Sequence, residues 1–230
     1  MWSMSMTFKD KTVLITGGTG GIGKQLVKDF EDAGATVIST STKTLNFLDP
    51  SSVSLFLNGI EDLDIDICIN NAGINEINSI CETSDQSWED IITVNLTGAF
   101  KITKTVVKRM MERGNGKVIN ISSVWGHKSR EGRAAYSASK FALRGLTQAI
   151  AAEAAPKGVL VNSVSPGFTR TDLTKFTLGG DGIKEIEKSI PIGRLATTKE
   201  ISNVIIFLAS DLNTYISGQD IIVDGGFLSA

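Results

Sequence analysis

The feature that most constrains this chain is a cluster of glycines directly after its first apolar run. The run Thr12–Thr16 is rich in β-branched and aliphatic residues, and the glycine-rich segment Gly17–Gly23 follows it at once. Helical periodicity then extends from about Ile22 to Ala33 and stops at Gly34. A strand, a tight glycine turn and a helix in this order form the first half of a βαβ unit, whose next strand is parallel to the first.

The rest of the chain repeats this alternation of strand-like and helix-like segments, which is typical of a parallel sheet covered by helices. The expected strands are Thr12–Thr16, Thr36–Thr40, Ile65–Asn70, Lys117–Ser122, Leu160–Ser165 and Asp220–Asp224. The expected helices are Ile22–Ala33, one beginning after Pro50, Ser84–Arg113, Ala135–Ala155 and Thr198–Ser210. The sequence therefore predicts an α/β fold, a Rossmann-type, doubly wound and mostly parallel sheet in one domain over residues 1–230.

One segment interrupts the alternation. Only the short stretch Ser41–Leu48 separates the second strand from the helix that begins after Pro50. Two neighbouring parallel strands need a crossover of about a dozen residues or more, so Leu45–Leu48 lies too close to the second strand to be a full third strand. We predict that this edge strand is reduced to a stub or absent, and that no helix lies between Thr42 and Asn46.

Composition excludes several classes of protein. The 230 residues are 41% hydrophobic, which is enough for one substantial core, and the net charge of −2 indicates neither nucleic acid nor a membrane surface as partner. The single histidine, His127, excludes a multi-histidine metal site, and Cys68 and Cys81 lack ligand spacing, so we expect no metal. Cys68 lies in an apolar run and is expected in the core. Met1–Met6 does not read as a signal peptide, and no run approaches the ~20 apolar residues of a membrane span, so we expect a cytoplasmic protein.

Tyr136 and Lys140 are the first candidate catalytic residues. Their i, i+4 spacing at the start of an alanine-rich helix places them on one helix face. An ammonium group near a phenol favours the phenolate, so the tyrosine could exchange a proton closer to neutral pH. A surface tyrosine and lysine on an ordinary helix is the alternative interpretation of so short a pattern.

Asn95 is a second candidate, because it lies within an apolar stripe on the long expected helix. The stripe consists of Trp88, Ile91, Ile92, Ala99, Ile102, Val106 and Met110. A polar side chain on a buried stripe costs stability unless it is hydrogen-bonded. A structural asparagine that bonds neighbouring backbone is one interpretation, and a functional residue is the other.

Several motifs together resemble a known family. They are Thr16-Gly17-x-x-x-Gly21-x-Gly23, Asn70-Asn71-Ala72-Gly73, Asn95, Ser123, Tyr136-x-x-x-Lys140 and Pro166-Gly167. In order and spacing, and over almost the whole chain, this set resembles the compact, single-domain short-chain dehydrogenases/reductases. The ending, from Ile192-Gly193-Arg194-Leu195 to Val223-Asp224-Gly225-Gly226, is most similar to the 3-oxoacyl-carrier-protein reductase branch.

The resemblance implies a nicotinamide dinucleotide along the carboxyl ends of the strands. The implied cofactor-binding residues are Gly17, Thr19, Gly21, Ile22, Gly23, Ser41, Thr42, Lys43, Asn46, Phe47, Asn71, Gly73, Tyr136, Lys140, Pro166, Gly167, Thr169 and Thr171. NAD-specific members carry an acidic residue at the end of the second strand. This chain has Ser41-Thr42-Lys43 there, which favours NADP(H) over NAD(H), whereas Gly20 stands where many NADP-binding relatives have a basic residue.

The resemblance also implies catalytic roles. Tyr136 would exchange the proton with the carbonyl oxygen, Lys140 would lower the pKa of that tyrosine and anchor the cofactor, and Ser123 would orient the substrate. Asn95 would hold a water that links Lys140 to solvent. His127 and Trp125 are interpreted as surface loop residues, with a place in the substrate pocket as the alternative. Residues 172–190 are expected to form a substrate lid, mobile at Gly179-Gly180-Asp181-Gly182.

These expectations together predict an NADP(H)-dependent ketone reductase or secondary-alcohol dehydrogenase, with a small-molecule substrate. One alternative is a sugar-nucleotide-modifying enzyme, an epimerase or dehydratase, or a sugar ketone reductase. The other is a regulatory cofactor-binding protein without catalysis. Self-association as a homodimer or homotetramer is implied by the resemblance, and small residues on the Tyr136 helix (Ala138, Ala142, Gly145, Ala149 and Ala152) would permit close packing between subunits or within one.

Overall fold

The computed structural model describes residues 6–230, except for the side chains of residues 172–173 and 175–179. Its strands are β1 (Thr12–Ile15), β2 (Thr36–Ser39), β3 (Ile67–Asn70), β4 (Gly116–Ile121), β5 (Val159–Pro166) and β6 (Asp220–Val223). Its α-helices are α1 (Gly21–Asp32), α2 (Pro50–Ile60), α3 (Asp85–Ile92), α4 (Gly98–Arg113), α5 (Ala134–Ala154), α6 (Asp172–Lys188) and α7 (Thr198–Ala209). A π-helix (Thr93–Thr97) and two 3₁₀ turns (Val124–Gly126 and Ala155–Lys157) complete these elements.

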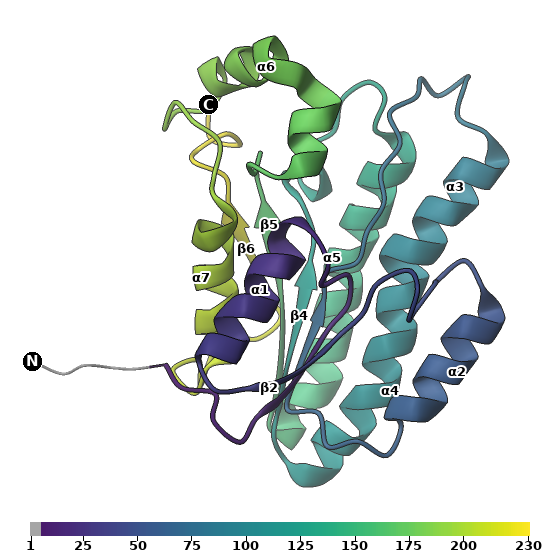
Figure 1. Cartoon of the computed structure of the whole chain (residues 1–230), viewed down its shortest axis with the longest axis vertical. Helices are drawn as coiled ribbons and strands as arrows, with labels where there is room; N and C mark the ends of the chain where they lie inside the picture. The colour runs from purple at the N-terminus through teal and green to yellow at the C-terminus, as the bar shows by residue number, and fades with distance from the viewer. Residues whose placement is uncertain (1–5) are drawn as a thin grey trace, which may run out of the picture.

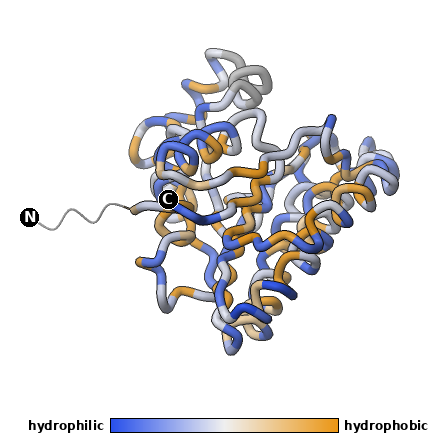
Figure 2. Tube along the Cα trace, turned by 60° about the horizontal axis from the view of Figure 1, so that its bottom comes forward, coloured by the Kyte–Doolittle hydropathy of each residue, from blue (hydrophilic) through white to orange (hydrophobic). Residues whose placement is uncertain are grey.

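The strands form one sheet in the order β2-β1-β3-β4-β5-β6, and every neighbouring pair is parallel. Figure 1 shows α1 and α7 on one face of this sheet and α2, α4 and α5 on the other. Alternate residues of the central strands enter the two cores, as in β1, where Val13 and Ile15 pack with α1 and α7 while Leu14 packs toward α4. Figure 2 shows this pattern as hydrophobic segments in the interior and alternating hydropathy along the helices. The predicted doubly wound α/β fold is confirmed.

The prediction for the segment after β2 is also confirmed in its main point. No helix lies between Thr42 and Asn46 in the described chain, and β2 is an edge strand. The expected stub is not a strand either: the backbone turns, with the amide of Thr44 donating to the carbonyl oxygen of Ser41 at 3.0 Å. Leu45 then enters the core and is only 3% exposed. The buried side chain of Leu45 thus anchors a loop in place of the expected strand stub.

The long helix predicted over Ser84–Arg113 is not uniform. The π-helix separates α3 from α4, so the two α-helical parts are not in one α-helical register. The predicted apolar stripe holds C-terminal to this insertion, where Ile102 and Met110 are fully buried. It fails at its other end, because Trp88 is 43% exposed. The π-helix contains Asn95, and the chain regains α-helical geometry at Gly98.

The segment expected to be a mobile lid is helical in the structure. Helix α6 runs through all three glycines at positions 179, 180 and 182. Its start is fixed by Thr171, whose hydroxyl oxygen accepts the backbone N–H of Thr174 at 3.1 Å. Glycine inside a helix costs about 1 kcal/mol relative to alanine, so the glycine cluster concealed this helix in the sequence. In Figure 1, α6 lies above the sheet, beyond the end of β5 that leads into it.

Candidate active site

A cavity of about 650 Å³ lies along the carboxyl ends of the strands. It is lined by residues from the loops after β1, β2, β3, β4 and β5 and from the start of α5. Of the residues singled out in the sequence, it brings together Gly17, Thr19, Gly21, Ile22, Ser41, Thr42, Asn46, Phe47, Asn71, Gly73, Ser123, Tyr136, Lys140, Pro166, Gly167, Thr169 and Thr171. Gly23, Lys43 and Asn95 do not line it.

The glycine loop at one end of the cavity has the geometry that its spacing indicates. Gly17 and Gly21 have positive φ angles of 68° and 51°, which side chains rarely adopt. Gly23 lies behind the loop, where a Cβ atom would stand 2.5 Å from Nδ2 of Asn71 and closer still to the carbonyl oxygen of Gly17. That amide of Asn71 donates to the carbonyl oxygens of Thr16 and Gly17 at 3.0 and 2.9 Å, so it fixes the loop on the neighbouring strand.

The loop after β2 closes the same end of the cavity. Ser41 and Thr42 line the cavity and offer hydroxyl groups, as predicted. Lys43 is exposed and is not a lining residue, because the turn from Ser41 to Thr44 directs Leu45 inward in its place. No carboxylate side chain lines the cavity in the described part of the chain.

Ser123 lies at the end of β4 and is 7% exposed. Its hydroxyl oxygen accepts the backbone N–H of Trp125 at 3.2 Å and so caps the 3₁₀ turn, which leaves the hydroxyl proton free to donate. Ser122 has the structural role that was expected of it, because its hydroxyl donates to the backbone oxygen of Lys140 at 3.1 Å. Both serines line the cavity, but the hydroxyl proton of Ser122 is used by the backbone of Lys140, whereas that of Ser123 is free to donate.

Tyr136 and Lys140 share one face of α5, as predicted. Nζ of Lys140 lies 5.6 Å from the centroid of the Tyr136 ring and donates to the backbone oxygen of Ile121 at 2.8 Å. Lys140 is 3% exposed, and this burial lowers its pKa to about 8. Lys140 lines the cavity, and with this pKa its ammonium group is partly deprotonated at mildly alkaline pH.

The electrostatics of Tyr136 differ from the sequence expectation. Burial raises the pKa of the phenol, and the groups that oppose this rise are the hydroxyl of Ser123 and the guanidinium of Arg133. Lys140 had been expected to lower the pKa of Tyr136, but its Nζ lies over the ring and bonds to backbone. In this structure the cation that favours the phenolate is Arg133, three residues before the tyrosine.

Both polar atoms of the Asn95 side chain are hydrogen-bonded inside the protein. Its Oδ1 accepts the backbone N–H of Ile74 at 2.8 Å, and its Nδ2 donates to the carbonyl oxygen of Ile74 at 2.9 Å and to Oγ of Ser139 at 3.1 Å. The side chain thus fastens the loop after β3 to α5, which carries the catalytic candidates. These bonds are those of the structural interpretation, and they also place Asn95 directly behind the cavity.

Sequence patterns assigned no role to Arg133 and favoured a surface position for Trp125 and His127. Trp125 matches the alternative interpretation, a place in the pocket, because it is 6% exposed and lines the cavity with Phe168 and Arg133. The position of Arg133, at i−3 from Tyr136, was the available signal for it. His127 is not a free surface histidine, because it pairs with Asp220, which also accepts a 2.7 Å hydrogen bond from the hydroxyl of Ser165.

Within residues 6–230 and their described side chains, no cluster of three or more metal-ligating side chains is found. No described helix has both the length and the apolar character needed to cross a membrane. Cys68 is buried as expected, and burial raises the pKa of its thiol to about 12, which makes it unreactive.

Comparison with known proteins gives consistent matches. Residues 58–228 match the family model described as enoyl-(acyl carrier protein) reductase. The 3-oxoacyl-[acyl-carrier-protein] reductase of Escherichia coli (strain K12) is 37% identical, over 96% of this chain and 98% of that protein. A structure from Beutenbergia cavernae, assigned as an NAD(P)-dependent gluconate 5-dehydrogenase with bound NADP, superposes with a TM-score of 0.93 at 30% identity, over 98% and 100% of the two chains. A 4-hydroxyisoleucine dehydrogenase complexed with NADH gives 0.90 at 30% identity, over 96% and 100%.

Proposed function

The chain belongs to the short-chain dehydrogenase/reductase family and is an NAD(P)-dependent oxidoreductase, and on this premise we propose that it interconverts a ketone and a secondary alcohol with NADP(H), using Tyr136 as acid and base. The observation that carries the proposal is the convergence of Ser123, Tyr136 and Lys140 on the cavity that the glycine loop closes.

The residues present fit a dinucleotide. Gly17, Gly21 and Gly23 leave a cradle that side chains would fill, and the start of α1 offers backbone N–H groups and the positive end of its dipole to a pyrophosphate. We propose that Asn71 and Gly73 lie near the adenosine ribose, Asn46 and Phe47 near the adenine, and the stretch from Pro166 to Thr171 near the carboxamide. When bound, the nicotinamide supplies or accepts the hydride.

The side chains at the end of the cavity opposite the glycine loop transfer the proton. Tyr136 gives its phenolic proton to the carbonyl oxygen during reduction and removes it during oxidation. Ser123 donates a hydrogen bond to the same oxygen, because its hydroxyl accepts the N–H of Trp125 and keeps its own proton for donation. Lys140 holds the nicotinamide ribose, while the hydroxyl of Ser123 and the guanidinium of Arg133 favour the charge that develops on Tyr136. We propose that Asn95 acts by positioning the loop after β3 and by holding a water that connects Lys140 to solvent.

The proposed preference for NADP(H) rests on the loop after β2. Ser41 and Thr42 offer hydroxyls, and no described lining side chain carries a negative charge that would repel a 2′-phosphate. Because an aspartate there would bind both ribose hydroxyls, Ser41→Asp should shift the ratio of kcat/KM for NADPH over NADH toward NADH by about 10-fold or more. A wild-type enzyme that prefers NADH would refute this assignment.

The proposed function is tested by measuring NADPH oxidation with ketones, oxo acids and a 3-oxoacyl thioester, in the wild type and in Tyr136→Phe. Loss of the proton donor should lower kcat by about 100-fold or more while NADPH still binds. Since the matched family model is described as an enoyl reductase, an unsaturated thioester belongs in the panel. Activity with that substrate alone, or full activity of Tyr136→Phe, would contradict the proposal.

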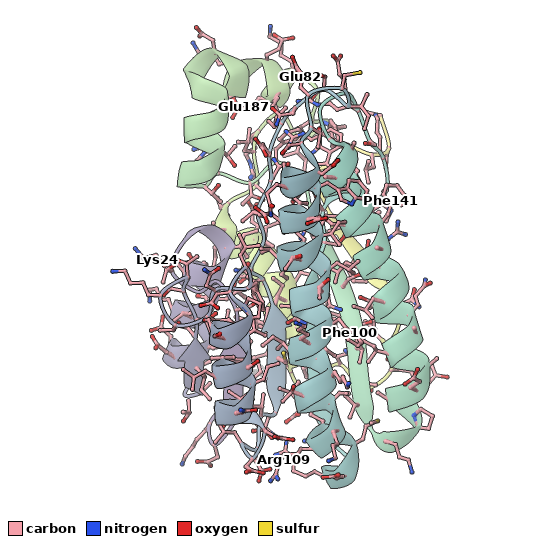
Figure 3. All side chains as sticks on the ribbon, turned by 90° about the vertical axis from the view of Figure 1, so that its right-hand side faces the viewer. Lys24, Glu82, Phe100, Arg109, Phe141 and Glu187 are labelled. Atoms are coloured by element: carbon pink, nitrogen blue, oxygen red, sulfur yellow. The ribbon has the colours of Figure 1, made fainter. Side chains whose placement is uncertain are left out.

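We further propose a homodimer or homotetramer that pairs through α4 and α5. Figure 3 shows Phe100 and Phe141 on these neighbouring helices, and both are 44% exposed. Beside them on α5, Ala142, Gly145, Ala149 and Ala152 are exposed and small, so a second subunit could approach closely. A monomer in sedimentation experiments would refute this assembly. A cytoplasmic location and a lid role for residues 172–190 are proposed on the same family premise.

A further inference from the structure

The substrate end of the cavity contains a buried cation for which the described side chains provide no counter-ion. Arg133, the residue directly before α5, is 7% exposed and lines the cavity. Its Nε has no hydrogen-bond partner. Burial and repulsion from Arg130 lower the pKa of its guanidinium, and the phenol of Tyr136 is the group that opposes them. An unpaired charge in such a place costs stability, so the site is unfavourable unless a ligand completes it.

The surroundings of Arg133 hold its side chain in place without neutralising it. The guanidinium lies 5.6 Å from the ring centroid of Trp125, at cation–π distance. Trp125 in turn packs edge-on against Phe168, with ring centroids 6.0 Å apart, and both rings line the cavity. A guanidinium beside an aromatic ring keeps its in-plane N–H groups for a planar acceptor, and a carboxylate is the acceptor that matches their fork.

The charges that line the cavity also favour an anionic ligand for Arg133. Among the described lining residues, the charged ones are Arg133 and Lys140, and both are cations. Lys140 is bound to the backbone of Ile121 and serves the cofactor in the proposed function. The glycine loop and α1 serve the pyrophosphate at the opposite end. Arg133, beside Tyr136, is therefore the cation that remains for the substrate.

We propose that Arg133 is a specificity-determining residue that binds a carboxylate of the substrate, so that the enzyme acts on oxo acids and the corresponding hydroxy acids. The carboxylate pairs with Arg133 while the carbonyl oxygen lies between Ser123 and Tyr136. This inference rests on the proposed function and narrows its substrate class. A neutral ketone or thioester leaves the buried guanidinium without a partner and is the poorer substrate.

The kinetic test compares acids with their uncharged amides as matched pairs, such as acetoacetate with acetoacetamide and pyruvate with pyruvamide. The ratio of kcat/KM for acid over amide should exceed 10 in the wild type for at least one pair. In Arg133→Gln that ratio should fall about 30-fold or more, mainly through KM, because truncating one member of a buried charge pair has an effect of that size. Arg133→Lys keeps the charge and should restore part of the ratio.

Arg130→Gln is the matched control. Arg130 lies 5.3 Å from the same Trp125 ring, but it is exposed and does not line the cavity. Removing it should leave the ratio nearly unchanged, because solvent screens the charge of an exposed arginine. An equal fall of the ratio in both variants would show a diffuse electrostatic effect and would overturn the proposal.

A second readout does not depend on turnover. Acetoacetate added to the NADP⁺-bound protein should raise the melting temperature of the wild type and of Arg130→Gln, but not of Arg133→Gln, because a ligand stabilises only a state that binds it. Turnover of neutral ketones with no preference for acids, and with no such stabilisation, overturns the Arg133 assignment and leaves the proposed function standing. Absence of turnover with every carbonyl compound overturns the proposed function instead.

Discussion

Replacing Gly23 with alanine is the sharpest perturbation of the cofactor site, because the added atom meets rigid groups on two sides. The new Cβ would lie 2.5 Å from Nδ2 of Asn71 and even closer to the carbonyl oxygen of Gly17. Contacts of Cβ below 3.0 Å essentially do not occur, so the glycine loop or the Asn71 side chain must move by about half an ångström or more.

The size of the effect follows from what that movement breaks. Overpacking of a close-packed site costs about 1–3 kcal/mol. Displacing Asn71 also weakens its two hydrogen bonds to Thr16 and Gly17, at about 1 kcal/mol each. Gly23→Ala should therefore lower the free energy of unfolding by about 3–5 kcal/mol and the melting temperature by about 10 °C. Affinity for NADPH should fall by about 100-fold, because the cradle at Gly17 is displaced.

Urea denaturation and fluorescence titration with NADPH measure the two quantities. Gly20→Ala is the matched control in the same loop, since nothing lies within 4 Å of its Cβ position and its φ of −148° suits any residue. Gly20 is the N-cap of α1, where alanine costs about 1 kcal/mol or less relative to glycine. If Gly23→Ala unfolds and binds NADPH as the control does, the close-packing argument for the loop is wrong.

Three further predictions concern Lys140 in the cavity and the supporting residues Asn95 and Asp220. Because burial lowers the pKa of Lys140 to about 8, kcat/KM for reduction should decline above pH 8 as its ammonium loses the proton, and Lys140→Arg should move this decline to higher pH; a flat profile to pH 10 would contradict it. Asn95→Ala leaves both backbone groups of Ile74 without partners and should lower the free energy of unfolding by about 2–3 kcal/mol, as measured in urea, together with kcat; unchanged stability would mean that its bonds contribute nothing. Asp220→Asn removes the charge that faces His127 and Arg144 and should lower the free energy of unfolding in urea by about 2–3 kcal/mol. A more stable variant would show that burying the carboxylate costs more than its two ion pairs contribute.

Local sequence signals predicted the parts of the fold that depend on neighbours in the chain. The glycine loop, the alternation of strands and helices and the i, i+4 pair of Tyr136 and Lys140 follow from backbone geometry and periodicity alone. The crossover length after β2 was equally local, and it excluded a full strand correctly.

Features that depend on tertiary contacts were not accessible in the same way. The π-helix around Asn95 is held by bonds to Ile74 and Ser139, which are distant in sequence, so periodicity predicted a uniform helix. The partner of His127 is Asp220, at the far end of the chain. The burial of Arg133 beside Trp125 also depends on how the loop after β4 folds over α5, and the sequence offered only its spacing from Tyr136.

The loop after β2, residues 41–48, contacts the start of α4 through Phe47. Phe47, in the proposed adenine site, lies on Gly98, where even a Cβ atom would stand 2.7 Å from the ring. Gly98 is the first residue of α4 and directly follows the π-helix that contains Asn95. A movement of Phe47 would therefore press on Gly98, next to the π-helix that holds Asn95. Because linkage is reciprocal, any coupling through this contact changes coenzyme affinity and substrate affinity by the same factor.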